Sequence, residues 1–291
     1  MDRLSQRLAA LKKPGRAGAP RAAARARPAR ASQARAAGDL VREPDGVEAF
    51  LLGGEVVTAH GPVYLHQRTR SQMDKGTARF LRRLAKLEAR ARKLDCHEEL
   101  ARLLSEGLSK ALFLDLETTG LSQSPVFLCG VMTAGRADWT LHQYFARHYA
   151  EEKALVRRAL ELLEERPTLV TFNGRTFDWP FLKTRAAYHR LKVPRDPFHV
   201  DLLRHSRRHF RGEYRDCKLK TLEWGVCGRR RVGDVDGAEI PELYHRYVKT
   251  GDPYPLAPVF HHNLLDLVTM GDLLVEILER EVGEQAESAA D

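Results

Sequence analysis

The chain has 291 residues, enough for one large domain or two small ones, and 43% of them are hydrophobic. It contains no apolar run of about 18 residues that would span a membrane, and no apolar segment near its start that would act as a secretory signal. We therefore expect a globular cytoplasmic protein with no membrane partner.

The formal net charge of +9 belongs to the N-terminal tail. Residues 1–42 carry 11 Lys and Arg against 2 Asp and Glu, and the remaining residues carry equal numbers of each sign. Residues 14–38 are almost entirely Ala, Arg, Pro and Gly, without apolar periodicity. Such a segment cannot bury enough surface to offset its conformational entropy, so we predict that residues 1–42 form a disordered basic tail.

Residues 43–109 are predicted to form a small N-terminal extension that packs on the main domain. Short strands are expected over 46–66, with turns at Gly53-Gly54 and Gly61-Pro62. Regularly spaced leucines over 77–109 predict helices.

The main domain is predicted over residues 110–280, followed by a flexible acidic C-terminus at 281–291. Three strands come first, and helices and short strands then alternate, which is the order of a ribonuclease-H-like α/β fold with a mixed sheet and flanking helices. The predicted strands are 111–117, 126–133, 138–145, 168–172 and 198–200. The predicted helices are 151–165, 177–191, 201–210, 218–225 and 262–279.

The four cysteines form no C-x-x-C pair, which favours reduced thiols in a cytosolic protein. Cys217 and Cys227 could be metal ligands, but no histidine is adjacent to either.

Two carboxylates stand near the end of the strand predicted at 111–117. Asp115 and Glu117 are two residues apart, so they point to the same face of that strand. Carboxylates held together in a buried place repel each other unless a cation lies between them. The strand therefore predicts a metal site if further ligands exist.

Three later residues supply candidates. Asp178 falls in the first turn of a predicted helix, where an acidic residue could simply complement the helix dipole. His262 and Asp266 are four residues apart and share a helix face. His261 is five residues from Asp266 and would face the same site only if it preceded the helix, so the choice between the two histidines stays open, with His262 preferred.

Together these residues match the requirements of two-metal phosphoryl transfer. Asp115, Glu117, Asp178 and Asp266 offer the hard oxygen ligands that suit two Mg²⁺ or Mn²⁺ ions. A histidine with a pKa near neutrality would orient or deprotonate the attacking water.

A basic segment is the candidate nucleic-acid surface. Residues 204–231 carry 10 Lys and Arg against 3 acidic residues, with Phe210, Tyr214 and Trp224 between them. Beside a carboxylate site this pattern favours contact with a phosphate backbone, although a solvated helix face explains it as well. Thr118 and Asn173 could touch a nucleotide or only form turns. The nucleic-acid candidates are Thr118, Asn173, Arg207, Arg208, Lys218 and Lys220.

The chain resembles the bacterial ribonuclease-H-like family typified by YprB, within the DEDD exonuclease superfamily. The resemblance spans about residues 110–275. It rests on E-T-T-G-L (117–121), N-G-x-x-F-D-x-P (173–180) and H-N-x-x-D (262–266), and on 143–145, 199–203 and 218–223.

The resemblance implies metal ligands at Asp115, Glu117, Asp178 and Asp266, with His262 as the base. It implies a metal-dependent 3′–5′ exonuclease acting on single strands or 3′ ends of DNA or RNA in the bacterial cytosol or nucleoid. Two alternatives are a non-catalytic nucleic-acid-binding protein on the same fold and an endonuclease of ribonuclease H or resolvase type.

Overall fold

A computed structural model describes residues 46–91, 96–121 and 123–288. The predicted basic tail, residues 1–42, lies outside the described residues.

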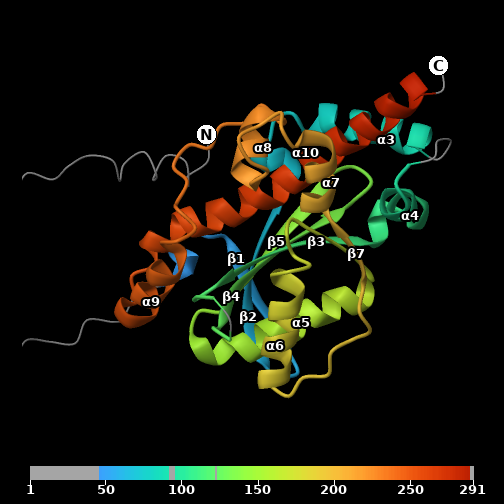
Figure 1. Cartoon of the computed structure of the whole chain (residues 1–291). Helices are drawn as coiled ribbons and strands as arrows, with labels where there is room; N and C mark the ends of the chain where they lie inside the picture. The colour runs from blue at the N-terminus through green and yellow to red at the C-terminus, as the bar shows by residue number, and fades with distance from the viewer. Residues whose placement is uncertain (1–45, 92–95, 122, 289–291) are drawn as a thin grey trace, which may run out of the picture.

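A seven-stranded mixed sheet forms the centre of the protein (Figure 1). Its strands are β1 (Gly53–Thr58), β2 (Gly61–Thr69), β3 (Ala111–Thr118), β4 (Val126–Ala134), β5 (Trp139–Phe145), β6 (Thr168–Thr171) and β7 (Phe198–Asp201). They lie in the order β1-β2-β5-β4-β3-β6-β7. Strands β3, β4 and β5 are antiparallel neighbours, whereas β3, β6 and β7 run parallel. The predicted α/β fold with a mixed sheet is confirmed.

Helices cover both faces of the sheet. The helices are α2 (Arg70–Met73), α3 (Thr77–Ala91), α4 (Glu98–Glu106), α5 (Glu152–Glu165), α6 (Asp178–Tyr188), α7 (Leu202–Phe210), α8 (Leu219–Gly225), α9 (Ile240–Thr250) and α10 (Ala257–Ser288). Helices α5 and α6 lie on one face, and the long helix α10 crosses the other with α3 beside it (Figure 1). None of the helices in the described part of the chain combines the length and hydropathy that a membrane crossing requires.

Alternation along β3 decides which face each of its side chains occupies. Leu112 and Leu114 pack in the core beneath α5, whereas Phe113 packs in the core beneath α10. Because successive side chains of a strand point to opposite faces, Asp115 and Glu117 share the face of Phe113. Both carboxylates therefore face α10.

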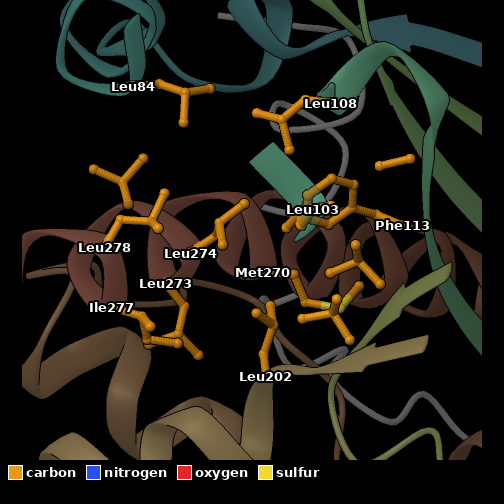
Figure 2. Packing of buried hydrophobic residues seen from close by; sticks show 14 of the residues in the cluster. Leu84, Leu103, Leu108, Phe113, Leu202, Met270, Leu273, Leu274, Ile277 and Leu278 are labelled. Carbon is orange, nitrogen blue, oxygen red and sulfur yellow. The ribbon is translucent and has the colours of Figure 1, made fainter. Parts of the chain in front are cut away.

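Helix α10 supplies much of the apolar core on its side of the sheet. Its buried residues pack against Phe113 of β3, Leu84 of α3 and Leu103 of α4 (Figure 2). The side chains labelled from this helix are Met270, Leu273, Leu274, Ile277 and Leu278. This packing fixes the helix against the sheet, and thereby fixes any polar side chain that the helix turns toward β3.

The N-terminal extension adds two strands to the same sheet. Strand β2 pairs with β5 in antiparallel register from Tyr64↔Phe145 to Thr69↔Thr140. The predicted turn at Gly53-Gly54 is wrong, because both glycines begin β1, and a Cβ at Gly53 would meet the Leu65 carbonyl oxygen at 2.2 Å. The turn lies between Thr58 and Gly61, and Gly61 has a φ of +115° that favours glycine.

Helix α10 is longer at both ends than the sequence predicts. It begins at Ala257, so His261 lies inside it, and it continues to Ser288. The flexible C-terminus at 281–291 stays a prediction, and the helix continues into that segment as far as Ser288. Glu281 is buried and accepts hydrogen bonds from His209 Nε2 (2.8 Å) and the His97 amide (3.1 Å), which tie the helix at this residue to α7 and to the start of α4. Helix α9 was not predicted.

The α10 core gives a stability prediction. Leu274 is fully buried, so Leu274→Ala is expected to lower the free energy of unfolding by about 2–5 kcal/mol, through lost burial and the cavity left behind. Leu52→Ala is the matched control, because that side chain is 88% exposed and should change stability by less than about 0.5 kcal/mol. Urea unfolding of both variants measures the difference, and equal effects would contradict the packing described.

Candidate functional site

The N-terminus of α6 is joined to β3 through a carboxylate. Strands β3 and β6 pair only as far as Phe113↔Val170. Beyond that point Asp178, the first residue of α6, accepts a hydrogen bond from the Leu116 amide at 3.0 Å. Since Leu116 lies between Asp115 and Glu117, this bond places the third predicted carboxylate beside the first two.

Asn263 of α10 orients Asp115. Its Nδ2 donates to Asp115 Oδ2 at 2.7 Å, and its Oδ1 accepts from Gln143 Nε2 at 2.9 Å. Gly130 of β4, paired with Asp115 in the sheet, makes room for the amide, because a Cβ there would lie 2.1 Å from Asn263 Oδ1. The close approach of α10 to the sheet therefore depends on a glycine in the neighbouring strand.

Asp266 and His262 both lie on α10 and belong to a network of charged side chains that extends to other elements. His262 Nε2 lies 3.4 Å from Asp266 Oδ2, and its Nδ1 is hydrogen-bonded to Asp234 Oδ1 at 2.7 Å. Asp266 also forms an ion pair with Arg231, which in turn pairs with Glu223 of α8. His262 therefore lies between two carboxylates, whereas His261 has no hydrogen bond to either of them.

Burial and mutual repulsion set the protonation of the carboxylates. Burial raises the pKa of Asp115 well above its usual value, and the charges of Asp266 and Asp178 raise it further. Burial, followed by the charge of Asp115, does the same to the pKa of Glu117. Burial raises the pKa of Asp178 to about 7, against the hydrogen bond from Leu116. Ionisation of Asp115, Glu117 and Asp178 is therefore unfavourable in the folded, metal-free protein.

The fourth carboxylate behaves in the opposite way. Burial acts to raise the pKa of Asp266, but hydrogen bonding to His262 and the charge of Arg231 outweigh it and lower the pKa. For His262, burial lowers the pKa, but its bonds to Asp234 and Asp266 prevail and raise it to about 10. Asp266 and His262 therefore form a charged pair at neutral pH when no metal is bound.

The donor set fits a hard divalent cation. Six carboxylates and three cationic side chains, Arg231, His262 and Lys220, meet at this site, so negative charge remains uncompensated when all are ionised. The carboxylates are Asp115, Glu117, Asp178, Glu223, Asp234 and Asp266. Oxygen ligands of this kind suit Mg²⁺ or Mn²⁺. A divalent cation would relieve the repulsion that raises the pKa of Asp115 and Glu117.

A different group has the tightest spacing of possible metal ligands. Within residues 46–91, 96–121 and 123–288, His97, Glu99 and His205 form the group whose ligand atoms all lie within 4.8 Å of one another. Glu99 is already paired with Arg175 (2.9 Å) and Arg204 (3.0 Å), which neutralise its charge. We interpret this group as an ion-pair network that links α4 to α7.

A cleft of about 790 Å³ opens beside the carboxylates. Asp115 and Asp266 lie on its wall, and three of the predicted nucleic-acid contacts lie there too: Asn173, Arg207 and Lys218. Asn173 also forms the turn before α6, with a φ of +68° and its amide bonded to Asp201 Oδ1 at 2.7 Å. Asp201 in addition accepts from the Leu203 amide, as the N-cap of α7.

The other three predicted contacts lie elsewhere. Thr118 is nearly buried, and its hydroxyl donates to the Gly120 carbonyl at 2.8 Å, as a turn residue would. Arg208 points toward the C-terminal part of α10, 3.4 Å from Glu281, and does not line the cleft. Lys220 lies next to the cleft and pairs with Asp234 at 2.9 Å. As nucleic-acid contacts, all six residues stay predictions.

Residues 112–278 match the family model RNase_H_2 of the RNase_H superfamily. The chain belongs to this superfamily. The predicted YprB-like relationship is also confirmed: the uncharacterized protein YprB of Bacillus subtilis is 32% identical over 189 residues, which cover 62% of this chain. The alignment covers 46% of YprB, so the chain spans less than half of that relative.

Two further proteins are similar. The uncharacterized protein MJ0365 of Methanocaldococcus jannaschii is 26% identical over 181 residues, covering 55% of this chain and 90% of MJ0365. Among solved structures, the family B DNA polymerase of Pyrobaculum calidifontis matches with a TM-score of 0.44 and 20% identity, over 56% of this chain and 24% of the polymerase. The superfamily membership gives this protein an RNase-H-like nuclease fold.

Sequence reasoning missed the residues that support the carboxylates. In the sequence, Asn263 is marked only by the H-N-x-x-D pattern, and Arg231 only by a basic run. Asp234 lies in the loop between α8 and α9, where no periodicity marks a functional position. A signal did exist for Glu223, since it is a lone carboxylate next to apolar residues in a short predicted helix.

The raised pKa of Asp178 predicts a pH-dependent stability. Between about pH 4 and pH 7 the folded metal-free protein keeps a proton on Asp178 that the unfolded chain releases, so this group makes folding less favourable as pH rises. Asp178→Asn stays neutral and still offers an oxygen to the Leu116 amide. Relative to wild type, we expect it to gain about 1–4 kcal/mol of stability between pH 4 and pH 7.

Urea unfolding with EDTA at several pH values measures this gain. Asp236→Asn is the matched control, because Asp236 is exposed and either residue can accept from the Ala238 amide. A difference between Asp178→Asn and wild type that does not change with pH would contradict the assignment.

Proposed function

We propose that the protein is a metal-dependent 3′–5′ exonuclease of the DEDD type that hydrolyses phosphodiester bonds at the ends of DNA or RNA. One observation carries the proposal: Asp115 and Glu117 of β3, Asp178 of α6 and Asp266 of α10 interact electrostatically in one place, although they come from distant parts of the chain. The free cysteines suit action in the bacterial cytosol.

Asp115, Glu117, Asp178 and Asp266 are the residues that would hold two Mg²⁺ or Mn²⁺ ions. The chemistry that such ions supply is activation of the attacking water and stabilisation of the leaving 3′-oxygen. The protein positions the ligands in advance: the Leu116 amide holds Asp178, and Asn263 holds Asp115. Arg231 keeps Asp266 ionised, which is the form a metal ligand requires.

His262 is proposed as the group that orients the attacking water and accepts its proton. Asp234 fixes the ring through Nδ1, which leaves Nε2 directed toward Asp266. Its raised pKa means that His262 is protonated in the metal-free protein and must lose that proton before it can act as a base. Positive charge brought to the neighbouring carboxylates favours that loss.

Asp115→Ala is expected to reduce Mn²⁺-dependent nucleotide release by more than about 100-fold. The substitution removes a proposed metal ligand that lies on β3 and lines the cleft. The assay uses end-labelled single- and double-stranded DNA and RNA, with wild type in EDTA as a second inactive reference. Asp236→Asn is the control variant and should keep full activity. Equal nucleotide release by Asp115→Ala and wild type would refute the proposal.

Two substrates separate the alternatives. A circular single strand lacks ends, so its cleavage would favour an endonuclease of ribonuclease H or resolvase type. Binding of the labelled strands without metal-dependent hydrolysis of any of them would favour a non-catalytic nucleic-acid-binding protein. Labels at the 5′ and 3′ ends report polarity, and 3′–5′ degradation releases the 3′ label first.

The two adjacent histidines give a paired prediction. His262→Gln is expected to lower kcat by about 100-fold or more, as loss of a general base does, whereas His261→Gln should stay close to wild type. Both residues lie inside α10, so each variant is the natural control for the other. A larger loss for His261→Gln would assign the base to that residue instead.

A further inference from the structure

An exposed tryptophan lies beyond the cleft. The chain has three tryptophans, of which Trp139 and Trp179 are buried, whereas Trp224 at the end of α8 is 56% exposed. The Arg230 guanidinium lies over its ring, 5.7 Å from the centroid. An aromatic face beside a cation is the pairing that stacks on a nucleobase and attracts the adjacent phosphate.

The surface between the cleft and Trp224 is continuous. A hollow of about 500 Å³ shares Tyr214 and Arg215 with the carboxylate cleft, and it reaches Trp224. A further hollow of about 370 Å³ shares Lys220 and Trp224 with it and extends to Arg230. A strand whose end lies at Asp115 can therefore follow one hollowed surface to Trp224.

Side-chain contacts fix this surface at Tyr214, where the cleft and the hollow meet, and near Trp224. Tyr214 donates from its hydroxyl to the Gly225 carbonyl at 3.0 Å, and its ring lies so close to Gly225 that a Cβ there would be 2.3 Å away. Near Trp224, Arg229 pairs with Asp272 (2.5 Å) and Arg231 pairs with Glu223. Arg229 and Arg231 thus point into the protein, whereas Arg230, which lies between them in the chain, is exposed to solvent.

The charge of this surface is available to a ligand. Among the described residues, Arg207, Arg211, Lys218 and Arg230 have no carboxylate within ion-pair distance, and all four are exposed. Arg207, Arg211 and Lys218 line the cleft itself. Unpaired cations along a groove that carries aromatic rings suit a single strand, whose bases are free to stack, better than a duplex.

We propose that Trp224 and Arg230 form a base-stacking platform for single-stranded nucleic acid, distal to the carboxylates and connected to them by the surface through Tyr214 and Arg215. The proposal rests on the proposed function for the position of the strand end. The platform gives a strand that reaches it an additional anchor, whereas a strand too short to reach it binds only at the cleft.

Binding measured in EDTA tests the platform without hydrolysis. The full chain is titrated with oligothymidylate and oligouridylate of about 4 and about 16 nucleotides, and affinity is followed by anisotropy of a labelled strand. Trp224→Ala is expected to weaken binding of the longer strands by about 5- to 100-fold and to leave the shorter strands unchanged. Trp224→Phe should retain most of the affinity, because the smaller ring still stacks. The two sugars show whether the platform serves DNA, RNA or both.

Tyr188→Ala is the matched control. Tyr188 is also exposed and also has an arginine over its ring, Arg185 at 4.2 Å, but it belongs to α6 and lines neither the cleft nor the hollows toward Trp224. Its loss should not change binding. In wild type, the longer strands should also quench tryptophan emission, since Trp224 is the exposed tryptophan.

The outcomes separate this proposal from the exonuclease. Unchanged binding of long strands by Trp224→Ala, an equal loss for both lengths, or a similar loss in Tyr188→Ala would overturn the platform, even if hydrolysis depends on Asp115. Length-dependent loss at Trp224 without any metal-dependent hydrolysis would support the platform and refute the exonuclease.

Discussion

The candidate site depends on bringing four carboxylates together between β3, α6 and α10. Asp115, Glu117 and Asp178 have raised pKa values because burial and neighbouring negative charge both oppose ionisation. Such an arrangement makes folding less favourable at neutral pH and persists only where the surrounding structure compensates for it. The same repulsion creates the affinity for a cation, so the instability and the proposed function have one physical origin.

The compensation is distributed over the fold. Hydrogen bonds hold two of the carboxylates. The Leu116 backbone amide donates to Asp178 of α6, and the Asn263 side-chain amide donates to Asp115 of β3. Cations hold the carboxylate of α10, where Arg231 and His262 flank Asp266. Arg231 depends in turn on Glu223, which is buried in α8. A substitution of Arg231 or Glu223 is therefore expected to change the site by changing the position or charge of Asp266.

Helix α10 links the stability of the fold to the geometry of the site. Its C-terminal two-thirds pack Leu273, Leu274 and Ile277 into the core (Figure 2), while its N-terminal part presents His262 and Asp266 to β3. Because one rigid helix carries both sets, the core fixes the distance of Asp266 from the strand. Gly130 allows that distance to be short.

The sequence by itself determined the order of strands β3 to β7 and of the helices between them, the mixed sheet, and the candidate ligands at 115, 117, 178 and 266, because alternation, helical spacing and lone carboxylates in apolar runs are local signals. Tertiary structure alone decided which groups support those ligands. Asn263, Arg231 and Asp234 act across 28 to 148 residues of sequence separation, and the loop that carries two of them has no periodic pattern. It also decided that His261 lies within α10 and that Arg208 turns to Glu281, since helix ends and side-chain directions follow from packing partners distant in the chain.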